Sequence, residues 1–301
     1  MKLLDILTSP WAIVPEKLFE IRDVYLVHMR GEKIDIKGIE TRMQAGVEKK
    51  KGERYDIIDG TAIIPIMDVI TKHMTFWSFF FGGTSSAEVG RILKDALVNP
   101  EVKSILLNID SPGGTVDGTQ ELADLIYAAR GQKPIISYTD GMMASAAYYI
   151  GSAADAVYIS GDMPNIGSIG VVTEHIDYSK HDEKLGIKRT EIYAGKYKRI
   201  GSTNEPLSED GKEYLQDIVD YTYSIFVNDV AKYRGISIEK ALEMADGKIF
   251  IGKQAIEVGL VDGVSTFDRL VDTVLPVMQA ERADAQALAE LNNSLRKELY
   301  I

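Results

Sequence analysis

The segment Asp140–Tyr149 places one serine, Ser145, among small residues shortly after a glycine-led turn. A serine hydroxyl attacks a carbonyl only when a base takes its proton and hydrogen-bond donors stabilise the oxyanion that forms. The side chains of Ala144 and Ala146 are small enough to let a peptide backbone come close to Ser145. Because serine is also a common N-cap residue, the segment alone predicts either a nucleophile or an ordinary helix start.

A glycine pair stands upstream, where a strand pattern changes to a helix pattern. Residues 102–110 read as a buried strand, Ser111-Pro112-Gly113-Gly114 follows, and residues 116–130 have helical spacing of apolar residues. Glycine permits positive φ and close approach of a ligand to backbone amides. Amides near a helix start can stabilise a developing negative oxygen. The pattern predicts either an oxyanion loop or a simple strand-to-helix turn.

A basic, glycine-flanked loop follows a short strand pattern within residues 189–202. A lysine acts as a base only when burial or positive neighbours lower its pKa. Lys196, Lys198 and Arg199 crowd one another, which acts in that direction. The alternative interpretation is an exposed basic loop without a catalytic role.

Taken together, these segments resemble the serine–lysine peptidases of the signal peptide peptidase A type, which include the head-maturation proteases of tailed phages. The resemblance covers about residues 60–265, and Ala146 and Ala147 replace glycines that often follow the nucleophile in that family. The matching motifs, in chain order, are Ser111–Gly114, Met143–Tyr149, Ile166–Val171, Ala194–Lys198, Gly247–Ala255 and Gly259–Asp262.

The resemblance implies a role for individual residues. Ser145 corresponds to the nucleophile and Lys198 to the general base of a serine–lysine variant of the catalytic triad. Lys196 is the alternative base, because both lysines would point to the same side of an extended segment. Ser168 would hold the lysine amine. The oxyanion hole would be formed by the amides of Gly114 or Gly113 and of Ala146.

A histidine-based site is a competing hypothesis, because the related Clp-type peptidases use serine, histidine and aspartate. His175 and Asp177 follow Ser145 on an apparent strand and could complete such a triad. Two arguments count against it. Residues two apart on one strand seldom place the acid behind the imidazole. The Gly-Ser-Ile-Gly turn around Ser168 also occupies the position expected for the Clp-type histidine.

The predicted function is a serine endopeptidase that cleaves scaffold and other head proteins during phage capsid maturation. One alternative is a signal-peptide-degrading peptidase. Another is an inactive or acyl-CoA-binding relative, for which Asp110 and Asp117 are the available carboxylates. No cofactor or metal is expected. The resemblance also implies a homo-oligomer, with active sites commonly completed between subunits.

Composition restricts partners and location. The formal net charge of −11 disfavours binding to nucleic acid or to an anionic membrane. The absence of cysteine excludes disulfides and thiol nucleophiles. The N-terminus lacks the apolar core of a secretory signal. The aromatic window 74–83 is far shorter than the roughly 20 apolar residues that span a bilayer. We therefore expect no stable membrane insertion and a location in the cytoplasm or within a phage prohead.

Strand patterns alternate with helix patterns, which predicts an α/β fold with a largely parallel sheet. The resemblance narrows this prediction to the Clp protease/crotonase-like fold, with repeated β-β-α units. We expect an N-terminal region and linker at 1–55, a peptidase domain at 56–266 and a C-terminal helical tail at 267–301. The aromatic window, which contains Phe76, Trp77 and Phe79, is interpreted as a substrate groove, an oligomer contact or core.

Overall fold

The computed structural model describes residues 10–29, 55–73 and 83–299. The aromatic side chains predicted to line a groove or interface (Phe76, Trp77 and Phe79) lie outside the described residues. So does the charged run 48–53, which the sequence predicts as a solvated linker.

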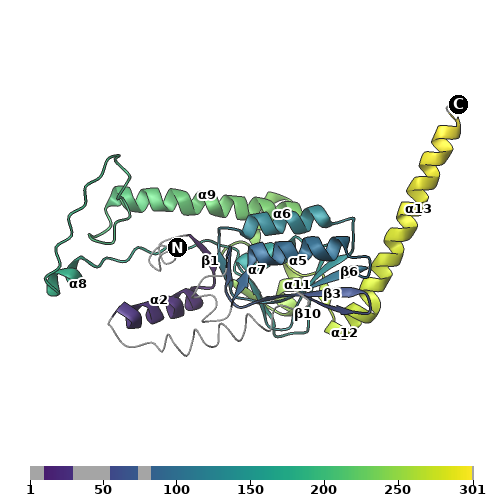
Figure 1. The fold of residues 1–301 in the computed structure, drawn as a ribbon, viewed down its shortest axis with the longest axis horizontal. Coiled ribbons are helices and arrows are strands. Elements are labelled where there is room, and N and C mark those ends of the chain that lie inside the picture. Colours follow the sequence, from purple (N-terminus) through teal and green to yellow (C-terminus); the bar gives the residue numbers. More distant parts are fainter. Residues whose placement is uncertain (1–9, 30–54, 74–82, 300–301) are drawn as a thin grey trace.

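A six-stranded sheet forms the centre of the molecule, in the order β13-β10-β8-β6-β3-β2 (Figure 1). All neighbouring pairs are parallel except the β2–β3 pair at the edge. The prediction of an α/β fold with a largely parallel sheet is confirmed. The strands are β2 (Asp56–Ile58), β3 (Thr61–Met67), β6 (Ser104–Asp110), β8 (Ile135–Thr139), β10 (Ala156–Ile159) and β13 (Gly263–Val264).

Long strands of this sheet are followed by a short strand and then by a helix. The first unit is β3, β4 (Ile70–Thr71) and α5 (Ser86–Val98), with β5 (Thr84–Ser85) just before the helix. The second unit is β6, β7 (Gly113–Thr115) and α6 (Thr119–Ala129). The third unit is β8, β9 (Met142–Ala144) and α7 (Ala146–Ser152). The short strands form two further sheets. One has the order β1-β7-β4-β5, with β1 at Trp11–Ile13. The other has the order β12-β11-β9, with β11 at Asn165–Gly167 and β12 at Ile249–Ile251.

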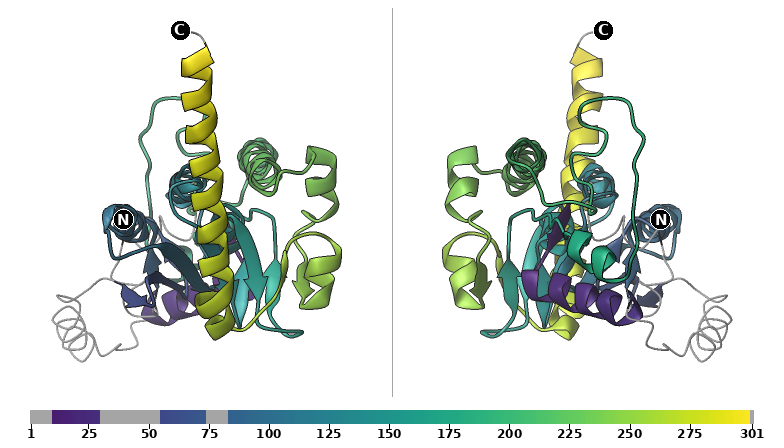
Figure 2. Two further views of the ribbon diagram at one scale, coloured as in Figure 1. Left: turned by 90° about the vertical axis from the view of Figure 1, so that its right-hand side faces the viewer. Right: turned by 90° about the vertical axis from the view of Figure 1, so that its left-hand side faces the viewer.

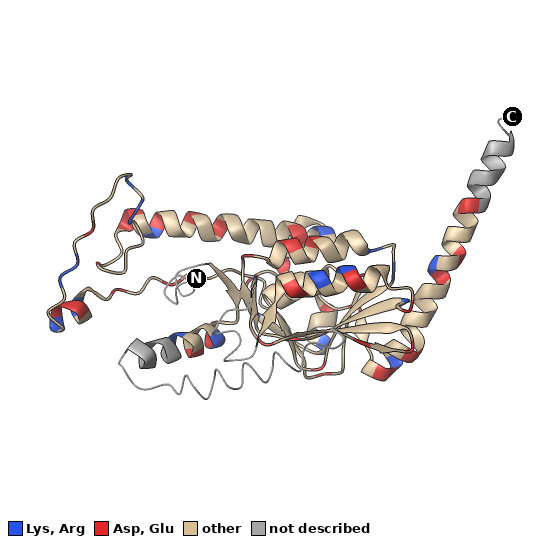
Figure 3. Ribbon diagram, in the orientation of Figure 1, with Lys and Arg blue, Asp and Glu red and all other residues tan. Residues whose placement is uncertain are grey.

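Apolar residues on both faces of the central sheet explain why layers cover both sides. Ile105, Leu107 and Ile109 point to the face that packs against α5, α6 and α7. Leu106 points to the opposite face, where Leu270 and its neighbours cover it. This alternation follows from the two-residue period of a strand. Charged side chains gather on the helices and the outer loops, and the strands of the central sheet carry few (Figure 3).

Helix ends agree with the capping residues in the sequence. The side chain of Ser85 accepts a hydrogen bond from the Glu88 amide at the start of α5. Ser208 accepts from the Gly211 amide at the start of α9 (Glu209–Arg234). The helix α10 (Ile238–Glu243) follows, capped by Ser237. The predicted C-terminal helix is present as α13 (Leu275–Leu299), which leads away from the body (Figure 2).

An arm projects from the body at the end opposite α13 (Figures 1 and 2). We define the arm as residues 173–208, which contain α8 (Ser179–Lys184), with the first half of α9. The larger buried side chains of α9 lie at Phe226 and beyond, so only its second half packs on the body. The predicted strands within 189–202 and at His175 are absent, because these arm residues form turns and irregular backbone.

The remaining elements of the described chain are α2 (Pro15–Met29), α11 (Lys253–Glu257), α12 (Phe267–Arg269) and the π-helical turn η1 (Leu270–Val274). Arg282 of α13 forms an ion pair of 2.6 Å with Asp155, which ties the base of α13 to the body. Within the described ranges, no helix has both the length and the apolar character needed to cross a membrane.

The C-terminal end of α7 depends on Arg130. Its guanidinium donates hydrogen bonds to the carbonyls of Ala153, at 2.9 Å, Ser152, at 3.2 Å, and Ala154. These carbonyls have no intrahelical donor, because they lie at the helix end.

We expect Arg130→Gln to lower the free energy of unfolding by about 2 kcal/mol. The reason is that hydrogen bonds to charged groups are strong and that their loss leaves buried carbonyls without a donor. Chemical denaturation measures this change. The matched control is Arg91→Gln, in an exposed arginine of α5, which should change stability by about 0.5 kcal/mol or less. Equal losses in both variants would contradict the role of Arg130.

Candidate active site

Ser145 stands at the junction between β9 and α7, in an unusual backbone conformation. Its φ is 54° and its ψ is −120°. Its amide donates to the Gly167 carbonyl at 2.7 Å, and its carbonyl accepts from the Tyr149 amide at 2.9 Å. The side chain is 1% exposed, and its Oγ has no hydrogen-bond partner among the described residues. Ser145 begins the helix without capping it, so the N-cap interpretation of its side chain fails.

The same turn occurs a second time in the chain, with a glycine. Gly252 lies between β12 and α11 and has φ 49° and ψ −113°. Glycine adopts this conformation without steric cost, whereas a residue with a Cβ pays about 1–3 kcal/mol. The chain therefore has a strained serine at a turn where glycine would be unstrained, which indicates a function for the hydroxyl.

The Ser111–Gly114 loop lies directly beside Ser145. The Ser111 amide donates to Met142 at 2.8 Å, and the Ala144 amide donates back to Ser111 at 3.2 Å, so the loop pairs with β9. The Ser111 hydroxyl donates to the Asp68 carbonyl and accepts from the Gly113 amide. These bonds hold the glycine pair beside Ser145, the predicted nucleophile, where the sequence predicts an oxyanion loop.

Gly113 must be glycine for two reasons. Its φ is +103°, and an added Cβ would lie 3.0 Å from the Ser145 Cβ and 2.2 Å from the Ala12 carbonyl oxygen. The amide of Ala146 is the first in α7, so it has no acceptor within the helix. Ala146 and the glycine pair thus flank Ser145, in the arrangement that an oxyanion hole requires.

Ser168 lies on the strand beside Ser145. The parallel pairing of β11 with β9 matches Gly167 with Ala144, so Ser168 follows at the level of Ser145. Its amide donates to the Lys248 carbonyl at 2.7 Å, and its φ is 50°. Both serines are therefore held in rare backbone conformations at one edge of the β9–β11 pair.

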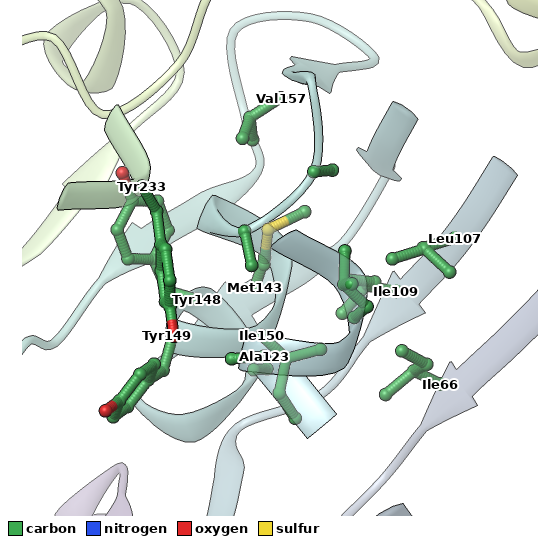
Figure 4. Packing of buried hydrophobic residues seen from close by; sticks show 14 of the residues in the cluster. Ile66, Leu107, Ile109, Ala123, Met143, Tyr148, Tyr149, Ile150, Val157 and Tyr233 are labelled. Carbon is green, nitrogen blue, oxygen red and sulfur yellow. The ribbon is translucent and has the colours of Figure 1, made fainter. Parts of the chain in front are cut away.

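Aromatic residues fix α7 against α9, where Tyr149 lies near Tyr233 (Figure 4). Tyr149 also stacks on Phe226 with ring centroids 4.4 Å apart, and its hydroxyl donates to Asp229. Burial, followed by this hydrogen bond, raises the pKa of the Tyr149 hydroxyl, which keeps it protonated as a donor. The neighbouring Tyr148 hydroxyl donates to the Leu260 carbonyl at 2.9 Å. The helix that follows the nucleophile is therefore firmly positioned.

The candidate lysines lie on the arm, away from Ser145. Lys198 is exposed and lines a cavity of about 390 Å³, formed by arm residues with Leu215 of α9. Lys196 contacts Tyr197 and lies 3.4 Å from Asp210. Hydrogen bonding to Tyr197, and then to Asp210, raises the pKa of Lys196, which is the wrong direction for a base. Among the described residues of one chain, neither Lys196 nor Lys198 hydrogen-bonds to Ser145.

The histidine alternative is not assembled either. His175 Nε2 lies 2.9 Å from the Ser202 carbonyl oxygen, and the ring lines the arm cavity with Lys198. The Asp177 carboxylate accepts from the Ser179 amide at 2.8 Å, and this contact with Ser179 lowers its pKa. Neither residue hydrogen-bonds to Ser145.

The two carboxylates considered for acyl-CoA chemistry have structural contacts. Asp110 accepts from the Met142 amide at 3.0 Å, and Asp117 accepts from Lys72 Nζ at 2.8 Å. Among the described residues, no cluster of three or more histidine and acidic side chains could hold a metal ion.

Comparison with known proteins agrees with this geometry. Residues 128–280 match the model of peptidase family S49. The chain belongs to family S49. The resemblance seen in the motifs of the sequence is thereby confirmed.

Curated relatives of this S49 family member include proteins from an archaeon and from phages. A putative protease of Methanocaldococcus jannaschii is 43% identical over 58% of the chain and 56% of that protein. The head-tail preconnector protein GP5 of Enterobacteria phage P21 is 31% identical over 71% of the chain and 42% of that protein. Capsid assembly protease C of Escherichia phage lambda is 31% identical over 71% of the chain and 48% of that protein. The chain thus spans about half the length of these relatives.

Gly113→Ala tests the contact between the loop and the nucleophile. The added Cβ should shift Ser145 relative to the predicted oxyanion donors, so we expect peptidase activity to fall by about 100-fold or more. Gly131→Ala is the matched control, because Gly131 also has a positive φ but nothing within 4 Å of an added Cβ. Activity is compared per folded molecule, because the clash at Gly113 destabilises the chain more than Gly131→Ala does. Loss of activity in Gly113→Ala alone would support the argument. Equal activity would contradict it.

Replacing Ser145 with glycine should release backbone strain. We expect Ser145→Gly to be about 1 kcal/mol more stable than Ser145→Ala in chemical denaturation, although both lack the hydroxyl. Ser152 provides the control, because it lies within α7 and glycine should there be the less stable replacement. The same order at both positions would contradict the inferred strain.

Proposed function

We propose that this S49 protein is a serine endopeptidase in which Ser145 is the nucleophile and Lys198 the general base. The observation that carries the proposal is the strained backbone of Ser145 against Gly113 at the start of α7. A hydroxyl held in this way can attack a carbonyl group whose oxygen accepts hydrogen bonds from the amides of the glycine pair and Ala146.

The proposed reaction is acyl transfer. Neutral Lys198 takes the proton of the Ser145 hydroxyl as Oγ attacks the substrate carbonyl carbon. The lysine then gives that proton to the departing amine, and an ester of Ser145 with the acyl part remains. Water next attacks this ester, with Lys198 again as base, and releases the acid and the free serine. Ser168, beside Ser145, would orient the lysine amine.

Lys198 would reach Ser145 from a second copy of the chain. The arm carries exposed apolar side chains at Leu185, Ile187, Ile192, Tyr193 and Tyr197. Exposed apolar groups of this kind are typical of surfaces that meet another protein. Docking of the arm on a neighbouring body would cover them and would supply the base that the body lacks. We therefore propose a homo-oligomer whose active sites are shared between copies.

The proposed substrates are scaffold and other head proteins during phage capsid maturation. Support comes from the two phage relatives, which cover 71% of the chain, and one of these is described as a capsid assembly protease. A location in the cytoplasm or within a prohead belongs to this proposal. A putative signal peptide peptidase of Enterococcus faecium matches 60% of the chain, so degradation of signal peptides is the alternative.

Mixing two inactive variants tests both the dyad and its sharing. Ser145→Ala and Lys198→Ala should each lose cleavage of candidate head proteins, measured by mass spectrometry of fragments. Co-refolded in equal amounts, they should recover about a quarter of the wild-type activity, because that fraction of shared sites receives both wild-type residues.

Lys212→Ala is the matched control for the lysine, because Lys212 is another exposed lysine at the arm end of α9, and it should retain activity. Full activity of Lys198→Ala would refute its role as the base. Loss of activity in both variants without recovery on mixing would refute sharing between copies.

A further inference from the structure

The strand β1 fills the space between the two chain segments that flank Ser145. On one side it runs antiparallel to β7, with Trp11 opposite Thr115 and Ile13 opposite Gly113. On the other side Trp11 and Val172 exchange backbone hydrogen bonds, both of 2.8 Å. Val172 follows Ser168 closely in the chain. A segment of this chain therefore lies in extended form between the oxyanion loop and the strand extension that follows Ser168.

The register of β1 places a carbonyl group at the oxyanion loop. The Val14 amide donates to the Pro112 carbonyl at 2.9 Å, and the Val116 amide donates to the Pro10 carbonyl at 3.5 Å. Hydrogen-bonded pairs alternate in antiparallel strands, so Ala12 and Gly114 form the bonded pair between these two. The Ala12 carbonyl thus accepts from the Gly114 amide, one of the proposed oxyanion donors.

The same carbonyl lies beside the nucleophile. A Cβ added to Gly113 would be 2.2 Å from the Ala12 oxygen and 3.0 Å from the Ser145 Cβ, so the Ala12 carbonyl and the Ser145 side chain border the same small space beside Gly113. This is where the carbonyl of a peptide substrate has to lie when Ser145 attacks it. Residues 10–14 therefore have the strand direction, the register and the carbonyl position of a bound peptide.

The side chains of β1 alternate between two environments, as in a peptide bound by strand addition. Ala12 lines a mainly apolar cavity of about 170 Å³, together with Val116, Tyr149, Val171 and Phe226. Trp11 and Ile13 point the other way and pack with Leu18 and Val69. The cavity beside Ala12 would accept a small or medium-sized apolar side chain.

Burial shows that the nucleophile is covered. Ser145 is 1% exposed, and Trp11, Ala12 and Ile13 are 1%, 2% and 3% exposed. A substrate cannot approach a hydroxyl in this state. Because the Ala12 carbonyl occupies the Gly114 amide and β1 occupies the edge of β7, β1 has to leave before another peptide can bind there.

We propose that residues 10–14 occupy the peptide-binding cleft of this enzyme as an intramolecular competitor of substrate. The inference rests on the proposed function of Ser145. Substrates would then bind as extended segments antiparallel to β7, with a small or apolar residue at the position of Ala12. The bond that is cut corresponds to the Ala12–Ile13 bond. The apparent affinity for substrate is reduced by the fraction of chains in which β1 is in place.

Covalent labelling provides a test that does not depend on turnover. The chain has two tryptophans, and Trp77→Phe leaves Trp11 as the sole emitter. A small alkyl fluorophosphonate bonds to the Ser145 oxygen and releases fluoride, which places a phosphonyl group where the Ala12 carbonyl lies. We expect stoichiometric labelling, seen as the mass increase of one adduct, together with a red shift of Trp11 emission as β1 enters solvent.

The outcomes of labelling separate the two proposals. The Ser145→Ala form of the same protein should show neither the adduct nor the shift. Labelling of Ser145 with unchanged Trp11 emission would overturn the competitor proposal and leave the nucleophile intact. If Ser145 is not labelled even in the Trp11→Ala variant, in which β1 is released, the proposed function itself fails.

Kinetics provides the second test, with acetyl-Pro-Trp-Ala-aminomethylcoumarin, which copies residues 10–12. Trp11→Ala removes the main anchor of β1, so KM should fall by about five-fold or more while kcat changes little. Phe19→Ala is the matched control, an exposed aromatic residue of the following helix, and its KM should equal the wild-type value. An unchanged KM in a folded, active Trp11→Ala enzyme would refute competition by β1.

Discussion

Backbone pairing on both sides of β9 is the constraint on which the active site depends. Ser111 pairs with this strand on one side, and β11 pairs with it on the other, up to the bond from the Ser145 amide to Gly167. The chain must then turn sharply into α7, so Ser145 takes a positive φ that an unconstrained serine avoids. The hydrogen bonds of two neighbouring segments and the packing of α7 hold this strain in place.

The two parts of the proposed chemistry lie on elements of different rigidity. The nucleophile and the oxyanion donors belong to the body, where Tyr149, Phe226 and Arg130 fix α7 from several directions. The candidate base belongs to an exposed arm whose packing on the body ends with the second half of α9. In the proposed oligomer, the arm gains its buried contacts only on a neighbour. Assembly would therefore bring the base to Ser145 and bury the apolar surface of the arm in one step.

Occupation of the cleft by β1 would add a second condition for activity. In the proposed scheme a lone chain lacks a base at Ser145, and its cleft also holds its own strand. Both conditions disfavour cleavage before assembly. Trp11 and Ile13 pack in a small cluster with Leu18 and Val69, and Ala12 is the one residue of β1 that packs in the main core. Release of β1 would therefore remove a single small side chain from the main core.

Local patterns in the sequence were sufficient for most elements of the body. The buried strand predicted at 102–110 and the helix predicted within 116–130 are confirmed as β6 and α6, because burial periodicity is a local property. The motif order also identified the family. The strand predicted from the alternating residues 189–193 of the arm is wrong, because this segment has no neighbouring strand to pair with.

Local sequence alone could not show three other features. The strain at Ser145 arises from pairing with Ser111 and Gly167, which are distant in the chain. The arm that contains Lys198 projects from the body that contains α7 (Figure 1), and this arrangement does not follow from spacing along the chain. The position of residues 10–14 over the nucleophile comes from long-range strand pairing. The sequence by itself thus determined the residues and the local elements, and only the tertiary structure decided which of them meet, because strand pairing joins segments that no local pattern connects.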